Sequence, residues 1–123
     1  MNYWVVGANW TGVDKTEEFT KQGYWTMGWA DNDQPVFTER RNKIQPGDRI
    51  AIKQLLGQGQ TEILVKALGI VESGSDENGN IKVDWVVTNM QKRVPIGGCI
   101  GTIYGPYNLD SPDREWINEV FRI

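Results

Sequence analysis

The sequence predicts an α+β fold, a small mixed β-barrel with flanking helices, in a single domain that spans residues 1–123. Two observations indicate strands. Short stretches rich in aromatic and β-branched residues recur along the chain, and Asn78-Gly79 between two of them is a strong hairpin signal. A third observation concerns order. The expected helices do not alternate regularly with the strands, which favours a small barrel over a doubly wound parallel sheet.

The expected helices carry recognisable signals at their ends. Asp14 or Thr16 can cap the first helix, and Gly23 can end it in the left-handed conformation. Ser111 and Pro112 suit the cap and the first position of the last helix. The complete expected order is a strand at 2–8, a turn at 9–12, helices at 14–21 and 36–43, strands at 49–53, 63–72, 82–87, 93–96 and 99–104, and a helix at 112–121.

The expected strands follow from patterning and from turns. The segment 82–87 alternates polar and apolar residues, which is typical of a strand with one buried face. The segment 63–72 contains a longer apolar stretch. Pro46-Gly47 favours a turn that leads into the strand at 49–53, and Gly105-Pro106 is expected to close the last strand.

Composition restricts the possible functions. Thirteen basic and 16 acidic side chains give a net charge of −3, so any nucleic-acid binding must depend on a local basic face and a shaped pocket. The chain has no histidine, which removes the commonest general base and metal ligand, and its single cysteine cannot form an internal disulfide. No signal peptide or membrane span is recognisable. We therefore expect a cytoplasmic protein with no metal, no cofactor and no membrane partner.

Three segments in series resemble EVE domains of the PUA-like superfamily. They are NYWVV at 2–6, QPGDRI at 45–50 and ALGIV at 67–71. The first is similar to the opening strand of EVE domains, the second to their x-x-G-D turn, and the third to a later strand. Two further segments, GYW at 23–25 and KVDW at 82–85, resemble the related YTH domains. Each motif is short, and the resemblance depends on their order and spacing from Asn2 to about Tyr107.

The resemblance implies a PUA-like barrel of the EVE/YTH type with a pocket for one base pulled out of its strand. In YTH domains that base is N6-methyladenine in RNA. In EVE-like domains fused to McrBC-type restriction enzymes it is a modified base in DNA, and this chain is most similar to that group. The implied function is a reader of a methylated or hydroxymethylated base, in DNA rather than RNA, that performs no chemistry. Such a sensor of a restriction or phage-defence system works with an effector nuclease or NTPase module, fused or separate.

By the same resemblance, Trp25 falls where YTH domains place their first cage tryptophan, and it is expected to form one wall of the pocket. Trp29 and Trp10 are further expected pocket residues, because a base stacked on an aromatic ring gains about 1–3 kcal/mol. A core position is the alternative interpretation of Trp25. The predicted base-binding set is Trp25, Trp29, Trp10, Asn9, Asp31, Asn32, Lys53 and Gln54.

The polar members of this set have specific expected roles. The amide of Asn9, and Asp31 and Asn32 in a polar loop, can read the edge of a base, while Lys53 can contact phosphate. A turn residue is the alternative for Asn9, and a solvated strand end is the alternative for Lys53. Two basic clusters are expected either to contact the nucleic-acid backbone or to form ordinary solvated surface. Their members are Arg40, Arg41, Lys43, Lys92 and Arg93.

Two other function classes remain open at this point. Some PUA-like relatives of the ASCH type cleave RNA, so a ribonuclease or RNA-binding domain is one alternative. Acid–base cleavage commonly uses histidine. Without it, only Lys53 or Tyr24 could serve in a Lys–Glu or tyrosine site, and Cys99 is interpreted as a small buried residue. We therefore expect no enzyme. The other alternative is a small-ligand or protein-interaction module that uses the same pocket, which the acidic balance favours.

Overall fold

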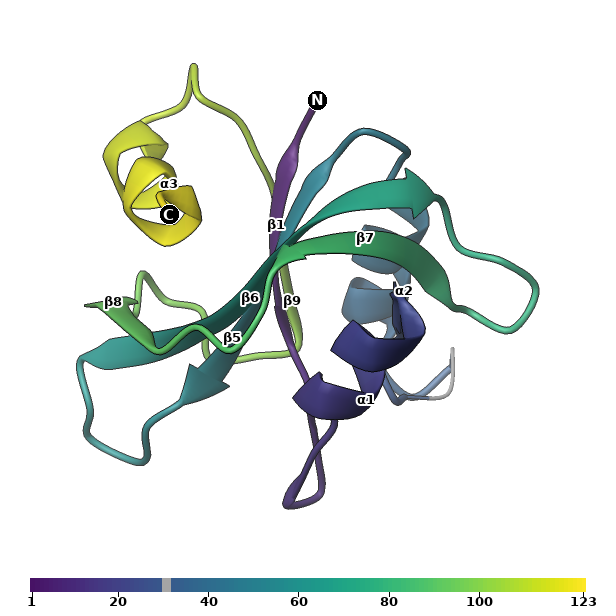
Figure 1. Ribbon diagram of the computed structural model, residues 1–123, viewed down its shortest axis with the longest axis horizontal. Helices are drawn as coiled ribbons and strands as arrows, with labels where there is room; N and C mark the ends of the chain where they lie inside the picture. The colour runs from purple at the N-terminus through teal and green to yellow at the C-terminus, as the bar shows by residue number, and fades with distance from the viewer. Residues whose placement is uncertain (30–31) are drawn as a thin grey trace.

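A large, mostly antiparallel sheet with helices on both sides organises the chain (Figure 1). The computed structural model describes residues 1–29 and 32–123. In these residues the elements are β1 (Tyr3–Gly7), β2 (Asn9–Trp10), β3 (Val13–Asp14), α1 (Thr16–Gln22), β4 (Tyr24–Trp25), α2 (Pro35–Lys43), β5 (Arg49–Leu55), β6 (Glu62–Ser73), β7 (Ile81–Val87), β8 (Lys92–Pro95), β9 (Ile103–Tyr107) and α3 (Arg114–Phe121).

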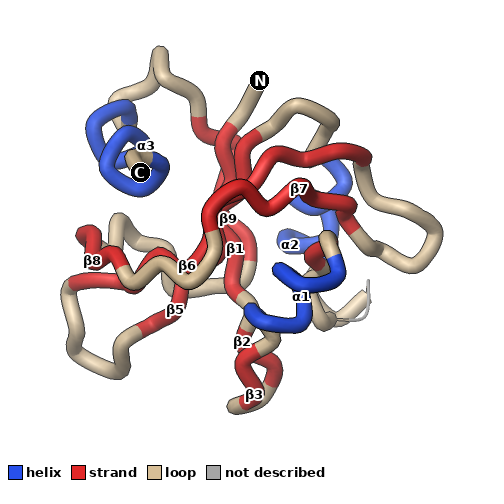
Figure 2. Tube along the Cα trace, in the orientation of Figure 1, coloured by secondary structure: helices blue, strands red, loops and turns tan. Residues whose placement is uncertain are grey.

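The strands of the main sheet follow the order β4-β7-β6-β5-β1-β9, and β8 pairs with β6 beside this path. The first residues of the long strand β6 pair with β8, and its later residues pair with β7. The pairing with β7 contains two register shifts. A separate hairpin joins β2 and β3 and projects beyond the main sheet (Figure 2). Of the helices described, none is both long and apolar enough to cross a membrane.

The pairing of β1 with β5 positions the candidate site. These two strands run parallel, in a register that pairs Tyr3 with Arg49 and Gly7 with Lys53. β9 and β6 flank the pair in antiparallel orientation. Because β1 and β5 run in the same direction, their carboxyl ends lie close together, and Gly7 at the end of β1 pairs with Lys53, two residues before the end of β5.

Two hydrophobic clusters lie on the two faces of this central pair. Successive side chains of a strand point to opposite faces, and β1 accordingly contributes Trp4 and Val6 to one cluster and Val5 to the other. The first cluster includes Phe19 of α1, whereas the second includes Val120 of α3. Figure 1 shows the matching arrangement, with α1 and α2 on one side of the strands and α3 on the other.

Most elements expected from the sequence are confirmed. The described residues contain helices near all three expected places, and β6 and β7 are joined by the loop that contains Asn78-Gly79. Gly23 ends α1 with φ of 75°, in the left-handed conformation that glycine adopts without strain. The short strand Tyr24–Trp25 was not expected, and it is fixed by antiparallel pairing with Ile81 and Lys82 of β7.

The end of the chain differs from expectation. The last strand does not span 99–104. It runs from Ile103 to Tyr107 and passes through the cis Gly105-Pro106 bond instead of ending there. Its position is set by pairing with β1, which begins where Ile103 faces Val6. The last helix begins at Arg114 with Asp113 as its cap. Ser111 belongs to the preceding turn, where its hydroxyl donates to the carbonyl of Asn108.

Candidate ligand-binding site

A cavity of about 420 Å³ opens at the carboxyl ends of β1 and β5. Its size falls within the range of about 300–1,000 Å³ that small-molecule sites occupy. Segments distant in sequence line it: the end of β1 with the following β2–β3 hairpin, the end of β5, the first turns of α1 and α2, and the loop before β9. The lining residues are Gly7, Ala8, Asn9, Asp14, Thr16, Trp29, Phe37, Lys53, Gln54, Leu55, Ile100, Gly101 and Thr102.

Two aromatic side chains contribute to the cavity lining. Trp29 is 44% exposed, and its indole nitrogen donates a hydrogen bond of 3.0 Å to the hydroxyl of Thr102. Phe37 comes from α2 and packs closely on Gly101, where an added Cβ would lie 2.8 Å from the ring. Gly101 therefore lets the phenyl ring approach the backbone of the loop. A hydrogen-bonded indole and a packed phenyl ring are surfaces on which a planar ligand can stack.

Lys53 contributes the charge of the site. Only 5% of this residue is exposed, and no hydrogen bond or ion pair reaches its ammonium group from the residues that the structure describes. Among those residues, Trp10 Nε1 is the one side-chain nitrogen or oxygen that is buried away from solvent and has no hydrogen-bond partner. The Lys53 ammonium therefore contacts solvent, and it does so through the cavity. Burial lowers the pKa of Lys53 to about 8, an effect that its interaction with Cys99 opposes.

The polar residues on the other side of the cavity are already partly engaged. The Asn9 side-chain oxygen accepts a 2.8 Å hydrogen bond from Gly12 N, so Asn9 is the turn residue that the alternative interpretation described. Asp14 accepts hydrogen bonds from Thr16 and forms an ion pair of 2.7 Å with Lys66. Burial raises the pKa of Asp14, but these partners outweigh it and lower that pKa. Asp14 therefore remains ionised at neutral pH and its charge is balanced.

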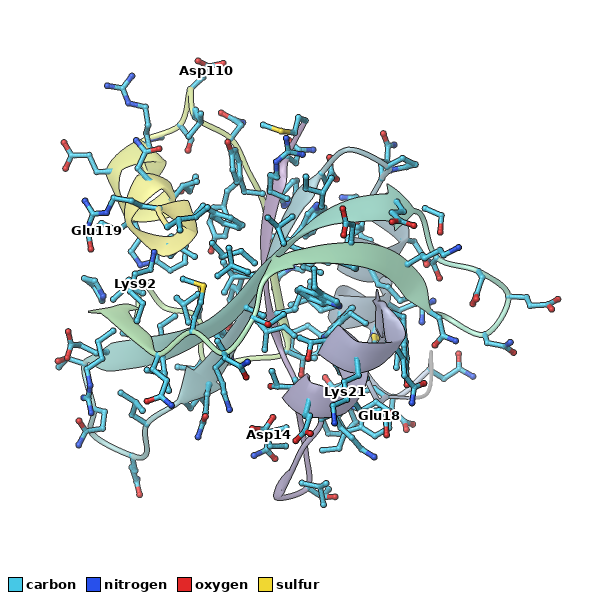
Figure 3. All side chains as sticks on the ribbon, viewed as in Figure 1. Asp14, Glu18, Lys21, Lys92, Asp110 and Glu119 are labelled. Atoms are coloured by element: carbon cyan, nitrogen blue, oxygen red, sulfur yellow. The ribbon has the colours of Figure 1, made fainter. Side chains whose placement is uncertain are left out.

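A larger and more polar hollow of about 650 Å³ lies next to this cavity along α1. Charged side chains that pair with one another line it, including Lys66 with Asp14 and Lys21 with Glu17. Figure 3 labels Asp14 and Lys21 near α1. Because no aromatic side chain lines this hollow in the described part of the chain, the cavity at β1 and β5 is the better candidate for a planar ligand.

The structure brings four of the predicted base-binding residues together at one cavity. Asn9, Trp29, Lys53 and Gln54 all line it. The glycines and Thr102 of the loop before β9, and Phe37 of α2, were missed. Phe37 lies in a helix whose sequence does not distinguish a cavity wall from ordinary packing.

Trp25 is a correction to the sequence analysis. It is completely buried in the first hydrophobic cluster, and its indole nitrogen donates a 2.9 Å hydrogen bond to the carbonyl of Gly7. No face of its ring is available to a ligand. Trp25 therefore packs in the core and holds the end of β1 through this hydrogen bond, which agrees with the alternative interpretation of a core position.

The other predicted pocket residues do not line the cavity. Trp10 packs against Phe19 and lies over Gly28, where an added Cβ would come within 2.5 Å of the indole. This contact directs Trp10 toward the core. Asn32 is an exposed turn residue away from the cavity lining. Asp31 lies outside the described residues.

Three residues of the basic clusters make contacts within the fold, and one of them, Arg41, is a correction because it is buried. Arg41 is buried, with 5% exposure, and donates to the side chain of Asn42. Arg40 donates a 2.6 Å hydrogen bond to the carbonyl of Ile103 and lies over the ring of Tyr104. The Lys92 ammonium donates to backbone carbonyls of Glu119 and Arg122 at the end of α3, and Figure 3 shows Lys92 beside this helix.

The remaining two basic residues stay on the surface. Lys43 forms an exposed ion pair of 3.2 Å with Glu39, and Arg93 lies 3.9 Å from Glu62. Exposed pairs of this kind contribute little to stability, so both cations can exchange their partners for phosphate. They come from α2 and β8, and neither lines the cavity.

The described residues contain no group of three histidine, cysteine, aspartate or glutamate side chains that could hold a metal ion. No family model and no curated protein matches the chain. The resemblance to EVE and YTH domains therefore stays a prediction, and the cavity itself is the basis for a functional proposal.

Proposed function

We propose that this chain is a reader domain of the PUA-like class that binds one modified base in the cavity between β1 and β5 and performs no chemistry on it. The observation that carries the proposal is the combination of Trp29, Phe37 and the unpaired ammonium of Lys53 around one cavity. Aromatic surfaces suit the faces of a base, and a donor at one side suits the oxygen atoms on its edge.

The energetics of base capture fit this arrangement. Stacking on one ring supplies about 1–3 kcal/mol, and removing a base from a duplex costs a few kcal/mol, less when the base is modified or mispaired. A buried methyl group adds roughly 0.8 kcal/mol. Two aromatic contacts with an edge hydrogen bond can therefore compensate for extrusion of a methylated or hydroxymethylated base. The resemblance to EVE-like domains favours DNA over RNA as the strand.

In this proposal the domain is the sensor of a modification-dependent restriction or phage-defence system. It recognises the modified base, and a nuclease or NTPase module, fused or separate, acts on the strand. The helices on both sides of the sheet, in the expected order along the chain, agree with the PUA-like barrel that the resemblance predicts.

A free small ligand is the second candidate, and one observation favours it. Arg40, Arg41 and Lys92 make contacts within the fold, and the net charge is −3, so the two predicted basic clusters leave only Lys43 and Arg93 for a phosphate backbone. Salt separates the two candidates. Binding to a strand weakens steeply with added salt, because the release of counterions from the phosphates becomes less favourable, whereas binding of a free neutral ligand changes little.

The decisive experiment is a fluorescence-polarisation titration against short DNA and RNA strands, unmodified or carrying N6-methyladenine, 5-methylcytosine or 5-hydroxymethylcytosine. The wild-type domain is expected to prefer one modified strand. Trp29→Ala should weaken that binding by about tenfold to a hundredfold, because it removes one stacking surface. Val86→Ala, at an exposed residue of β7, is the matched control and should leave the affinity unchanged.

The outcomes separate the candidates. Equal, weak affinity for every strand would overturn the reader proposal. Salt-independent binding of the free modified nucleoside, without binding of the strand, would support the second candidate. Unchanged affinity in Trp29→Ala would remove the cavity at β1 and β5 from the proposal.

A further inference from the structure

The proposed function needs a hydrogen-bond donor at Lys53, but it leaves the charge of this ammonium unexplained. Stacking needs no buried charge, yet Lys53 is 5% exposed and has no hydrogen-bond or ion-pair partner in the described part of the chain. Placing a charge out of water without a partner is unfavourable. A titratable group held in this way beside a cavity is characteristic of a functional site.

The groups that face Lys53 do not compensate its charge. Cys99 is buried, and burial raises the pKa of its thiol, so it remains neutral at physiological pH. Tyr107 interacts with Cys99, with 3.5 Å between hydroxyl and sulfur, and burial raises the pKa of this tyrosine as well. Asp14 lines the same cavity, but it is paired with Lys66 and Thr16.

Backbone geometry leaves the ammonium open to a ligand. Residue 7, which pairs with Lys53 in the parallel register, is a glycine. A Cβ at this position would lie 3.7 Å from Lys53 Nζ. Because glycine has no Cβ, no side chain at position 7 contacts the ammonium.

We infer that the cavity selects a planar ring that carries an acidic substituent, a carboxylate whose oxygen accepts a hydrogen bond from Lys53 Nζ. The inference rests on the proposed function, since it concerns the ligand of the same cavity. An ammonium has three donors and no acceptor, and its hydrogen bonds to an anionic oxygen are about twice as strong as neutral ones. Among modified cytosines, the preferred order is therefore 5-carboxyl, then 5-hydroxymethyl, then 5-methyl.

The experiment measures the affinity of one short strand that contains a single cytosine, 5-methylcytosine, 5-hydroxymethylcytosine or 5-carboxylcytosine. The wild-type domain should bind the 5-carboxyl strand at least about tenfold more tightly than the 5-methyl strand, as one charge-assisted hydrogen bond predicts. Lys53→Met keeps the length of the side chain and removes the charge. It should abolish the preference for the 5-carboxyl strand over the 5-methyl strand.

A measurement on the wild-type protein makes the test independent of that variant. The 5-carboxyl preference should be present at about pH 7 and lost at about pH 9.5, because Lys53 loses its proton near pH 8. The carboxylate of the base is ionised at both pH values. If Lys53→Met does not fold, this loss with rising pH still supports the inference, and a preference that persists at about pH 9.5 overturns it.

The failure of this inference is distinguishable from failure of the proposed function. Modified strands that bind better than unmodified ones, with no 5-carboxyl preference or with one retained in Lys53→Met, overturn the inference alone. Binding of no strand overturns the proposed function. In that case, sodium benzoate and benzamide test the cavity by NMR titration. Shifts near Lys53 with benzoate only, absent in Lys53→Met, support the inference, and their absence in the wild-type protein overturns it.

Discussion

The two ends of β5 each bury a charged side chain, and they treat it in opposite ways. At the start of the strand, Asp48 is 4% exposed and its carboxylate accepts three hydrogen bonds, from Asn2 N, Trp4 Nε1 and Gln45 N. At the other end, Lys53 is 5% exposed and receives no such partner from the residues described. The exposed fractions are nearly equal, so burial alone does not explain the difference.

The difference shows how a buried charge can be interpreted. A carboxylate that accepts hydrogen bonds from two neighbouring segments fixes β1 and the turn before β5 against each other. Its charge is satisfied by the fold. The ammonium of Lys53 lines a cavity and has no hydrogen-bond or ion-pair partner among the residues described. We therefore expect Asp48 to stabilise the fold and Lys53 to reduce its stability.

The largest expected effect is on the free energy of unfolding and concerns Asp48, whose carboxylate accepts three hydrogen bonds. Asp48→Ala should lower the free energy of unfolding by about 3–5 kcal/mol, because three donors lose their acceptor and Trp4 is completely buried, out of reach of water. Urea denaturation monitored by tryptophan fluorescence measures the change. Asp84→Ala, at an exposed position of β7, is the control and should change stability by less than about 0.5 kcal/mol. A loss below about 1 kcal/mol in Asp48→Ala would contradict the structural role.

The next largest effect on the free energy of unfolding has the opposite sign and concerns Lys53. Lys53→Met should raise the free energy of unfolding at pH 7 by about 3 kcal/mol, the value that corresponds to a pKa lowered from 10.5 to about 8. The folded state loses its proton at lower pH than the unfolded chain does. The contribution of Lys53 to wild-type stability therefore becomes more favourable as the pH rises from about 8 to 10.5, and the difference between the two proteins should shrink across that window.

Comparing the two proteins over pH isolates Lys53 from its neighbours. Burial raises the pKa values of Cys99 and Tyr107, so both groups lower wild-type stability in alkaline solution. Their contributions are largely shared by Lys53→Met and largely cancel in the difference. Urea denaturation at several pH values between about 6.5 and 10.5 gives the curve. A variant that is less stable than wild type at pH 7 would show that Lys53 supports the fold.

The smallest effect concerns Gly7, opposite Lys53. Gly7→Ala adds a Cβ at 3.7 Å from Lys53 Nζ and 3.8 Å from Thr102 Cα, both ordinary contacts. Stability should stay within about 1 kcal/mol of wild type, since alanine in a strand costs less conformational entropy than glycine. Ligand affinity should fall only a few-fold, because the methyl group covers one side of the ammonium. Thermal unfolding and the same polarisation titration measure both quantities. A large loss of stability with unchanged affinity would place Gly7 outside the site.

Sequence reasoning succeeded where a signal is local. The hairpin at Asn78-Gly79 and the end of α1 at Gly23 depend on backbone conformations that a few adjacent residues determine. The sequence grouped several residues of the cavity lining for a related reason. Asn9 follows β1, and Lys53 lies in the last part of β5, so residues near the ends of two strands were good candidates for a common location.

Two tryptophans four residues apart show where local reasoning stops. Trp25 and Trp29 lie in the same aromatic segment, and both were predicted to be pocket residues. Trp25 is buried because β4 pairs with β7 and its indole donates to Gly7, 18 positions away. Trp29 lines the cavity and donates to Thr102, 73 positions away. The sequence between them contains neither partner.

By itself, the sequence determined the type and approximate place of most helices and strands, the α+β class, and several residues near the cavity. The tertiary structure alone decided which charges are satisfied. Arg41 and Asp48 are buried within the fold, whereas Lys53 is left open to a cavity. The physical reason is that local conformation depends on neighbours in the chain, but burial and hydrogen-bond satisfaction depend on segments that meet only when the sheet assembles.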